Sequence, residues 1–174
     1  MKLNQFTQKI GLSVAILAVF MPSLLSAKGT ATVTFEDPES FTDIEMGAIT
    51  TDKDITYITG RLEKAFTKGA SRNLPDGYTI QVTVKDVDLA GDQDPFYSQL
   101  QDIRIYKEIY WPRIQFDYTI QDADGNTVSQ SEANLKNMTY LHDIHVGYRE
   151  ITHYTDRLIK DWMKRDIRKI LKNS

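Results

Sequence analysis

The sequence predicts an α+β fold of two layers, in which two helices pack on one face of a mainly antiparallel sheet of four to five strands. Three observations support this prediction. Several short segments alternate apolar and polar residues, which is the period of a half-buried strand. Two longer segments repeat apolar residues at the spacing of an amphipathic helix. The predicted order is strand, helix, three or four strands and helix, so both helices can cover one apolar sheet face.

The first predicted strand and helix follow each other closely. Residues 31–35 alternate as a half-buried strand, which ends before Pro38 because proline cannot donate to a ladder. Apolar residues between 55 and 69 recur at helical spacing, and the N-cap is expected among residues 50–52. A strand follows this helix, which is compatible with a right-handed crossover.

The second predicted strand changes phase near its end. Residues 78–84 alternate regularly, but Asp86 then falls on the face that had been apolar. A β-bulge near Lys85 would return Val87 and Leu89 to the core. We therefore predict a bulge at this position, and a local break of this kind is where strain or function is expected.

The later strands are less uniform. Residues 90–101 are interpreted as a loop, and residues 103–109 alternate only weakly. Residues 114–120 alternate strongly and predict a strand. Residues 122–126 then predict a hairpin turn, which leads into a mostly polar edge strand over residues 127–135.

The last predicted helix covers residues 151–171. Trp162 lies in the middle of its apolar stripe and is expected to be buried against the sheet. The outer side of the helix carries the cations Arg157, Lys160, Lys164, Arg165, Arg168, Lys169 and Lys172. Two interpretations of this face stay open. It binds an envelope protein or an anionic surface, or its cations only complement the helix dipole.

Residues 1–27 are typical of a secretory signal peptide. Lys2 and Lys9 give a basic start, a short apolar run follows, and the segment ends on the small residue Ala27. We predict cleavage after Ala27, so that residues 28–174 form a single periplasmic domain that is not an integral membrane protein. A retained membrane anchor is the alternative, because the apolar run is close to the length that spans a bilayer.

The rest of the chain combines an acidic body with a basic C-terminal segment. Residues 28–150 contain 12 Lys/Arg against 21 Asp/Glu, whereas residues 151–174 contain 7 against 3. The acidic body argues against general nucleic-acid binding. The chain has no cysteine, which excludes disulfides, thiol nucleophiles, iron–sulfur clusters and lipid attachment to a processing-site cysteine. We predict no cofactor.

Polar residues at the end of the second strand and before the next one form the candidate site. Asp86 and Asp88 are paired carboxylates, which can serve acid–base chemistry or bind a cation. We predict that one of them pairs with Arg104 or Arg113 across adjacent strands. Trp111 offers a surface on which a ligand could stack. A structural ion pair is favoured over a ligand site, because ion-pair networks also occur without function.

Two other motifs are interpreted as structural. His142, His145 and His153 are the only histidines, and with nearby carboxylates they could hold zinc or another transition metal. We favour a polar connector that leads into the last helix, and predict no metal site. Residues 122–126 faintly resemble a calcium loop, but aspartate and asparagine beside glycine are what a hairpin turn requires.

Several segments together resemble one family. They are Val33-Thr34-Phe35, Phe41-Thr42-Asp43, Asp86-Val87-Asp88-Leu89-Ala90-Gly91, Asp102-Ile103-Arg104-Ile105, Trp111-Pro112-Arg113-Ile114 and Asp161-Trp162. Over residues 33–162 the chain resembles the exported proteins of domain-of-unknown-function family 3016. The resemblance implies a periplasmic protein of one domain from a Gram-negative bacterium, and it implies no activity.

The function expected from the sequence is that of a non-catalytic periplasmic binding or accessory protein, which works through a sheet-and-helix surface. One alternative is a periplasmic enzyme of hydrolase type, with its site near Asp86, Asp88, Trp111 and Arg113. Another is a binder of glycans or small ligands. Convergence of the aspartates and arginines in a pocket would favour the enzyme, and an exposed Trp111 would favour stacking.

Overall fold

The computed structural model describes residues 28–46, 50–93, 104–142 and 150–173. The predicted signal peptide, residues 1–27, lies outside the described residues. The main elements are β1 (Thr30–Phe35), α1 (Asp52–Asn73), β2 (Thr79–Asp88), β5 (Arg113–Gln121), β6 (Thr127–Lys136) and α2 (His153–Asn173). Short elements are β3 (Asp92–Gln93), β4 (Arg104–Ile105) and 3-10 turns at Pro38–Ser40 and Tyr140–His142.

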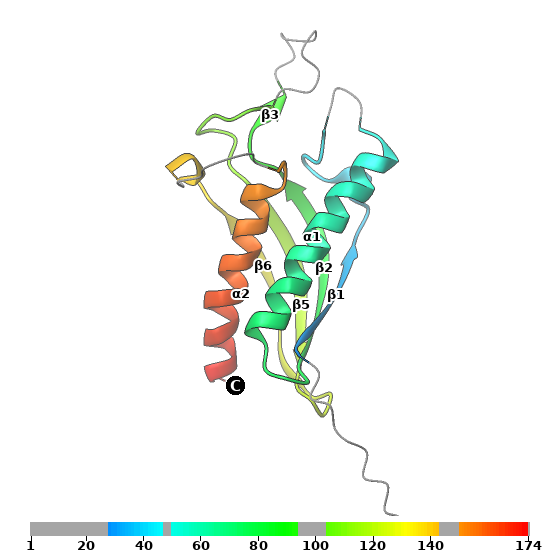
Figure 1. Ribbon diagram of the computed structural model, residues 1–174, viewed down its shortest axis with the longest axis vertical. Coiled ribbons are helices and arrows are strands. Elements are labelled where there is room, and N and C mark those ends of the chain that lie inside the picture. Colours follow the sequence, from blue (N-terminus) through cyan, green and yellow to red (C-terminus); the bar gives the residue numbers. More distant parts are fainter. Residues whose placement is uncertain (1–27, 47–49, 94–103, 143–149, 174) are drawn as a thin grey trace, which may run out of the picture.

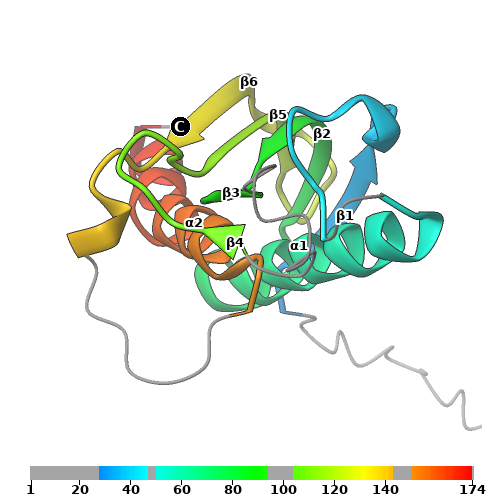
Figure 2. The same ribbon diagram turned by 90° about the horizontal axis from the view of Figure 1, so that it is seen from above.

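Four strands form the main sheet in the order β1-β2-β5-β6 (Figure 1). β1 and β2 are parallel, with α1 as the crossover between them, and the other two pairs are antiparallel. Both helices lie on the same face of this sheet, as the view from above shows (Figure 2). The predicted fold class is therefore confirmed: a mostly antiparallel sheet with two helices packed on one face.

Helix α1 begins within the range that the sequence predicts. Thr51 is the N-cap, and Asp54 completes a capping box by accepting the Thr51 backbone N–H at 2.9 Å. On the inward side, Ile58, Leu62 and Phe66 have no exposed surface. The helical stripe therefore faces the sheet and supplies one half of the core.

The β-bulge in β2 is confirmed. The register of β2 against β5 shifts between Val84 and Asp86, so the inserted residue is Lys85. Val87 and Leu89 are fully buried, as the bulge predicts. The bulge thus keeps the apolar residues in the core and turns the aspartates at the end of β2 to the opposite face of the sheet.

Helix α2 packs on the sheet through its apolar side, as predicted. Trp162 is 5% exposed, and its ring lies 4.9 Å from Phe116 and 5.0 Å from Tyr118 between centroids, both nearly edge-on. The two helices touch at Gly69, where an added Cβ would lie 2.6 Å from the Met163 side chain. Among the described residues, no helix has the length and apolar character needed to cross a bilayer.

The segment between β2 and β5 differs from the weak strand that the alternation suggests. β3 and β4 pair with each other in a separate two-stranded sheet, so residues 104–109 do not join the main sheet. The cause is Gly91, which has a φ of 82° and turns the chain away directly after β2. This small sheet lies at the end of the molecule where both helices begin (Figure 1).

The hairpin turn between β5 and β6 is present where the sequence predicts it. Asp122 Oδ1 accepts the backbone N–H groups of Asp124 and Asn126, each at 2.9 Å. Hydrogen bonds from Asn126 lower the pKa of the Asp122 carboxyl below its ordinary value. The carboxylate therefore acts as the internal acceptor of the turn.

Candidate functional site

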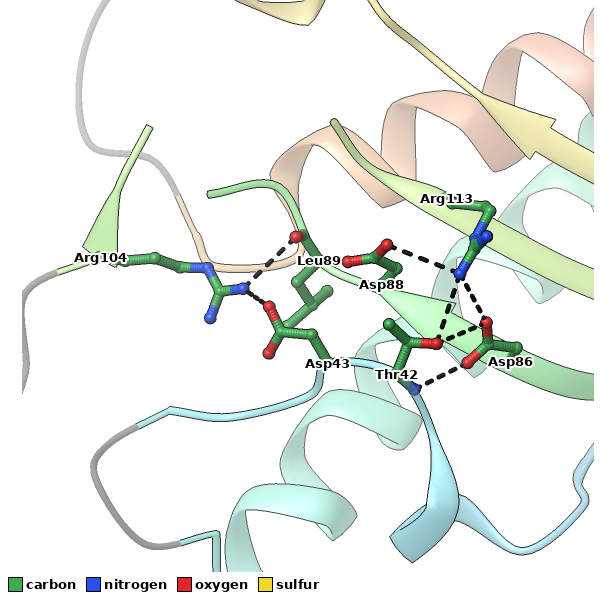
Figure 3. A network of polar contacts seen from close by, with 7 residues as sticks. All are labelled: Thr42, Asp43, Asp86, Asp88, Leu89, Arg104 and Arg113. Atoms are coloured by element: carbon green, nitrogen blue, oxygen red, sulfur yellow. Dashed lines mark hydrogen bonds and ion pairs between the residues drawn. The ribbon is translucent and has the colours of Figure 1, made fainter. Parts of the chain in front are cut away.

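The ion pair predicted at the end of β2 is present. Arg113, the first residue of β5, lies opposite Asp88 in the register. Its Nη2 atom is 3.1 Å from Asp86 Oδ2 and 3.7 Å from Asp88 Oδ2 (Figure 3). Thr42 joins them from the loop after β1, because its backbone N–H and its hydroxyl donate to the Asp86 carboxylate at 2.8 and 2.9 Å. The network ties three segments of the chain together.

The two aspartates of this network have different surroundings. Both carboxylate oxygens of Asp86 accept hydrogen bonds within the network. Burial raises the pKa of Asp88 above its ordinary value, and the positive charge of Arg113 opposes this shift. A carboxylate with both oxygens occupied is poorly placed to take a proton from a substrate. The arrangement suits a structural connection better than acid–base chemistry.

Arg104 belongs to a second network and is held away from the first. Its guanidinium pairs with Asp43, and the arginine side chain is only 8% exposed (Figure 3). It also donates to the backbone carbonyls of Ala90, Glu45 and Gly91, at 2.8, 2.9 and 3.0 Å. Arg104 comes from β4, whose place in the separate small sheet directs it to this partner. Asp43 completes the network, and the sequence prediction did not include it.

Trp111 is half-buried and packs into a small aromatic cluster. The cluster centres on Ala90, Tyr140 and Tyr154, and the rings of the two tyrosines are 4.7 Å apart between centroids. The Tyr140 hydroxyl donates to the Lys107 carbonyl at 2.8 Å, and burial raises the pKa of Tyr140 to about 12. Trp111 therefore packs against this cluster and does not stand free as a stacking surface.

The histidines are spread over different surroundings. His142 is exposed in the 3-10 turn, and His153 is half-buried at the start of α2. His145 lies outside the described residues. Within the part of the chain that the structure describes, no three His, Asp or Glu side chains come together in a group that could hold a metal ion.

A basic groove of ≈ 510 Å³ lies between α1 and α2. Most of the side chains that line it are cationic, and the other lining residues are Ala65, Gly69, Asn73 and Asp156. The cations of the groove are Arg61, Lys64, Lys68 and Arg72 from α1 and Lys160 and Lys164 from α2. The groove combines cations of both helices, whereas the sequence prediction considered only the basic face of the last helix.

One end of the basic groove is acidic. Arg61 lies 3.5 Å from Asp156 and 4.0 Å from Glu150, measured between guanidinium nitrogen and carboxylate oxygen. The hydroxyl of Thr152 donates to the same Asp156 oxygen at 3.1 Å. Burial raises the pKa of the Asp156 carboxyl, against the opposing effect of its hydrogen bond from Thr152. Arg61 is thus neutralised within the fold.

The other cations of the basic groove have no such partner. Among the residues that the structure describes, none of the five forms an ion pair with an acid: Lys64, Lys68, Arg72, Lys160 and Lys164. All five are exposed. On the outer side of α2, in contrast, Arg165 pairs with Asp161 and Lys169 with Asp166, each at 4.0 Å. The basic face predicted for this helix is therefore divided between paired and unpaired cations.

The cations of α1 have a signal in the sequence that the prediction did not use. Arg61, Lys64, Lys68 and Arg72 are spaced three, four and four residues apart, so they share one helical face. That face adjoins the apolar stripe of α1, which faces the sheet. Only the packing of α1 beside α2 brings this row next to Lys160 and Lys164.

The chain belongs to DUF3016, a family of proteins of unknown function. The family model matches residues 29–165. No curated protein matches the sequence. Among solved structures, it is similar to the PelC dodecamer from Paraburkholderia phytofirmans, with 10% identity, a TM-score of 0.36, and coverage of 83% of this chain and 92% of that one. This likeness is too distant to carry an argument about fold, assembly or ligand.

Proposed function

We propose that this chain is a non-catalytic binding protein of the periplasm, and that it binds an anionic ligand in the basic groove between α1 and α2. One observation carries the proposal: five exposed cations line the groove without an acidic partner among the described residues. A concave surface lined by one sign of charge raises the local concentration of ligands of the opposite sign.

Keeping these cations together costs stability. On α1, Lys68 lies four residues after Lys64 and four residues before Arg72. On α2, Lys160 and Lys164 are also four residues apart. Like charges at this spacing destabilise a helix by about 0.2–0.5 kcal/mol per pair. The two rows also face each other across the groove. A bound anion would remove this repulsion, which gives the arrangement a reason that folding alone does not supply.

The alternative functions receive less support from the geometry. A hydrolase-type site would need Asp86, Asp88 and Arg113 available to a substrate, but these groups are engaged with one another and with Thr42. A stacking site at Trp111 would need a free ring face, but this side chain packs against the aromatic cluster.

The periplasmic location rests on the N-terminal segment. Its basic start, short apolar run and small final residue predict cleavage after Ala27. Mass spectrometry of the periplasmic fraction should therefore find a mature N-terminus at Lys28. An intact chain that begins at Met1 in the membrane fraction would contradict this prediction and support a retained anchor.

The groove is tested by titrating the mature protein with inorganic triphosphate in a calorimeter. The variant Lys64→Gln/Lys68→Gln/Lys164→Gln removes three unpaired cations, and its affinity should fall by more than about tenfold. A matched control, Lys53→Gln/Arg165→Gln/Lys169→Gln, removes the same charge from exposed positions outside the groove and should bind like the wild type. Equal losses in both variants, or no binding by the wild type, would contradict the proposal.

A further inference from the structure

We propose further that the ligand is a linear polyanion, a chain of repeated negative groups that lies lengthwise along the basic groove. This inference rests on the proposed function and adds the class of ligand to it. The layout of the cations, and not only their number, carries the argument.

The cations of the groove form two rows along two helices that lie side by side. Both helices begin at the same end of the molecule, and they touch at Gly69 and Met163 (Figure 1). On α1, Lys64, Lys68 and Arg72 follow each other every four residues, or about 6 Å of helix axis, so the row extends over about 12 Å. Lys160 and Lys164 on α2 form the second row.

This length distinguishes a chain from a single anion. The oxygens of one phosphate or carboxylate accept hydrogen bonds from donors within about 3 Å. One such group can therefore contact only the cations whose side chains reach it at the same time. A chain with repeated charges can contact successive cations along the groove, and each contact adds to the binding free energy.

The type of cation points in the same direction. Four of the five unpaired cations are lysines, which are compact point charges on flexible stems. The planar fork of arginine is the side chain that fixes one phosphate or carboxylate in a defined orientation. Two arginines line the groove. Arg61 is paired with Asp156, so Arg72 is the one arginine among the five unpaired cations. Such a set tolerates variable positions of the anions, as a repeating chain requires.

The other residues in and beside the groove also fit an elongated ligand. At one end, Asp156 and Glu150 occupy Arg61, which is then not available to an anion, so the chain would extend toward Arg72. Between the cations, the groove is lined by the small residues Ala65 and Gly69, and Gly69 is where α1 approaches Met163 of α2 closely. A narrow ligand can therefore lie between the two rows of cations.

A flat anionic membrane fits these observations less well. An amphipathic helix binds a membrane by inserting its apolar side. The apolar side of α2 is not available, because Ile159 and Ile167 are fully buried and Trp162 is 5% exposed. The unpaired cations line a groove between two helices, whereas a bilayer offers a flat surface. Membrane binding is therefore kept as an outcome of the test.

The test compares orthophosphate, triphosphate and a polyphosphate long enough to span the groove, each titrated into the mature protein at several salt concentrations. Affinity should rise with chain length until the groove is filled. The slope of log K against log salt should also steepen with length, since each additional cation that is neutralised contributes about 0.7–0.9 to it. Vesicles containing phosphatidylglycerol serve as the membrane probe.

Single substitutions then locate the contacts. Lys64→Gln, Lys68→Gln and Lys164→Gln should each weaken binding of the long chain several-fold and lower its salt slope, while Arg165→Gln on the outer side of α2 should not. Unfolding midpoints that are no lower than that of the wild type show that the variants fold. If orthophosphate binds as tightly as the long chain, or if vesicles bind and soluble polyphosphate does not, the linear polyanion is wrong. If no phosphate and no vesicle binds, the proposed function fails as well.

Discussion

Two charged regions of this molecule are built in opposite ways. At the end of β2, Asp86 and Asp88 meet Arg113, and a few residues away Asp43 meets Arg104 (Figure 3). Each of these charges has a partner of opposite sign. In the basic groove, five cations lie on two adjoining helices with no acidic partner among the described residues.

This comparison distinguishes charges that stabilise the fold from charges that face the solvent. The paired groups connect segments that are far apart in sequence, such as the loop at Thr42 and the start of β5 at Arg113. Their removal should therefore change stability. The five unpaired cations of the groove form no ion pair within the described chain, so their removal should weaken binding and should not lower stability. The following predictions test this separation, beginning with the largest expected effect.

The groove depends on the docking of α2 against the sheet, to which Trp162 contributes a large buried side chain in contact with Phe116 and Tyr118. Trp162→Ala should lower the free energy of unfolding by about 3–5 kcal/mol, the usual loss for a buried large aromatic side chain. Chemical denaturation measures this change. A loss below about 1 kcal/mol would mean that α2 is peripheral to the core, and the groove could not then be a fixed structure.

Arg104 should be the most sensitive of the paired charges. Arg104→Gln would leave Asp43 without its cation and several backbone carbonyls without a donor. Because removing one partner of a buried pair leaves an uncompensated charge, we expect a loss of about 3 kcal/mol in denaturant unfolding. The control is Arg165→Gln, which breaks an exposed pair on α2 and should cost less than about 1 kcal/mol. Equal costs would show that the burial of Arg104 has no structural value.

The network at Arg113 should be weaker, because its side chains are more exposed. Asp86→Asn and Arg113→Gln should each destabilise the fold, and a double-mutant cycle should give a coupling energy of about 1 kcal/mol. Binding of polyphosphate should be unchanged in all three variants. Loss of binding with intact stability would move the functional site from the groove to the end of β2.

The acidic end of the groove should give a small pH effect. Burial raises the pKa of Asp156 above its ordinary value of 3.8, so the folded state binds this proton more tightly than the unfolded state. The resulting stabilisation is present at low pH and is lost as the pH rises through the raised pKa. Asp156→Asn should therefore flatten the dependence of stability on pH above about pH 4. If the variant and the wild type had the same dependence of stability on pH, the Asp156 carboxyl would be excluded as the source of that dependence.

Periodicity was sufficient to predict the elements that form the core. The bulge could be predicted because Asp86 interrupts a regular alternation, and because the buried residues Val87 and Leu89 require a change of phase. The burial of Trp162 followed from its place in a helical stripe. These are local patterns, and each depends only on which face of one element meets the core.

The partners of the charged residues were harder to predict, because they depend on how separate elements pack. Arg113 could be matched with the aspartates of β2, since neighbouring strands bring them into register. Arg104 could not be matched with Asp43, because their contact requires the turn at Gly91 and the small sheet of β3 and β4. The groove likewise needs the position of α1 beside α2, which neither helix specifies alone.

The central claim is that the unpaired cations of the groove bind a ligand, whereas the paired charges stabilise the fold. It is tested most directly by denaturant unfolding of the wild type, Lys64→Gln/Lys68→Gln/Lys164→Gln and Asp86→Asn, each with and without polyphosphate. A ligand that binds only the folded state stabilises it by RT ln(1 + [L]/Kd). Polyphosphate should therefore stabilise the wild type and Asp86→Asn by similar amounts, and the groove variant far less. Equal stabilisation of the groove variant, or its loss only in Asp86→Asn, would contradict the account.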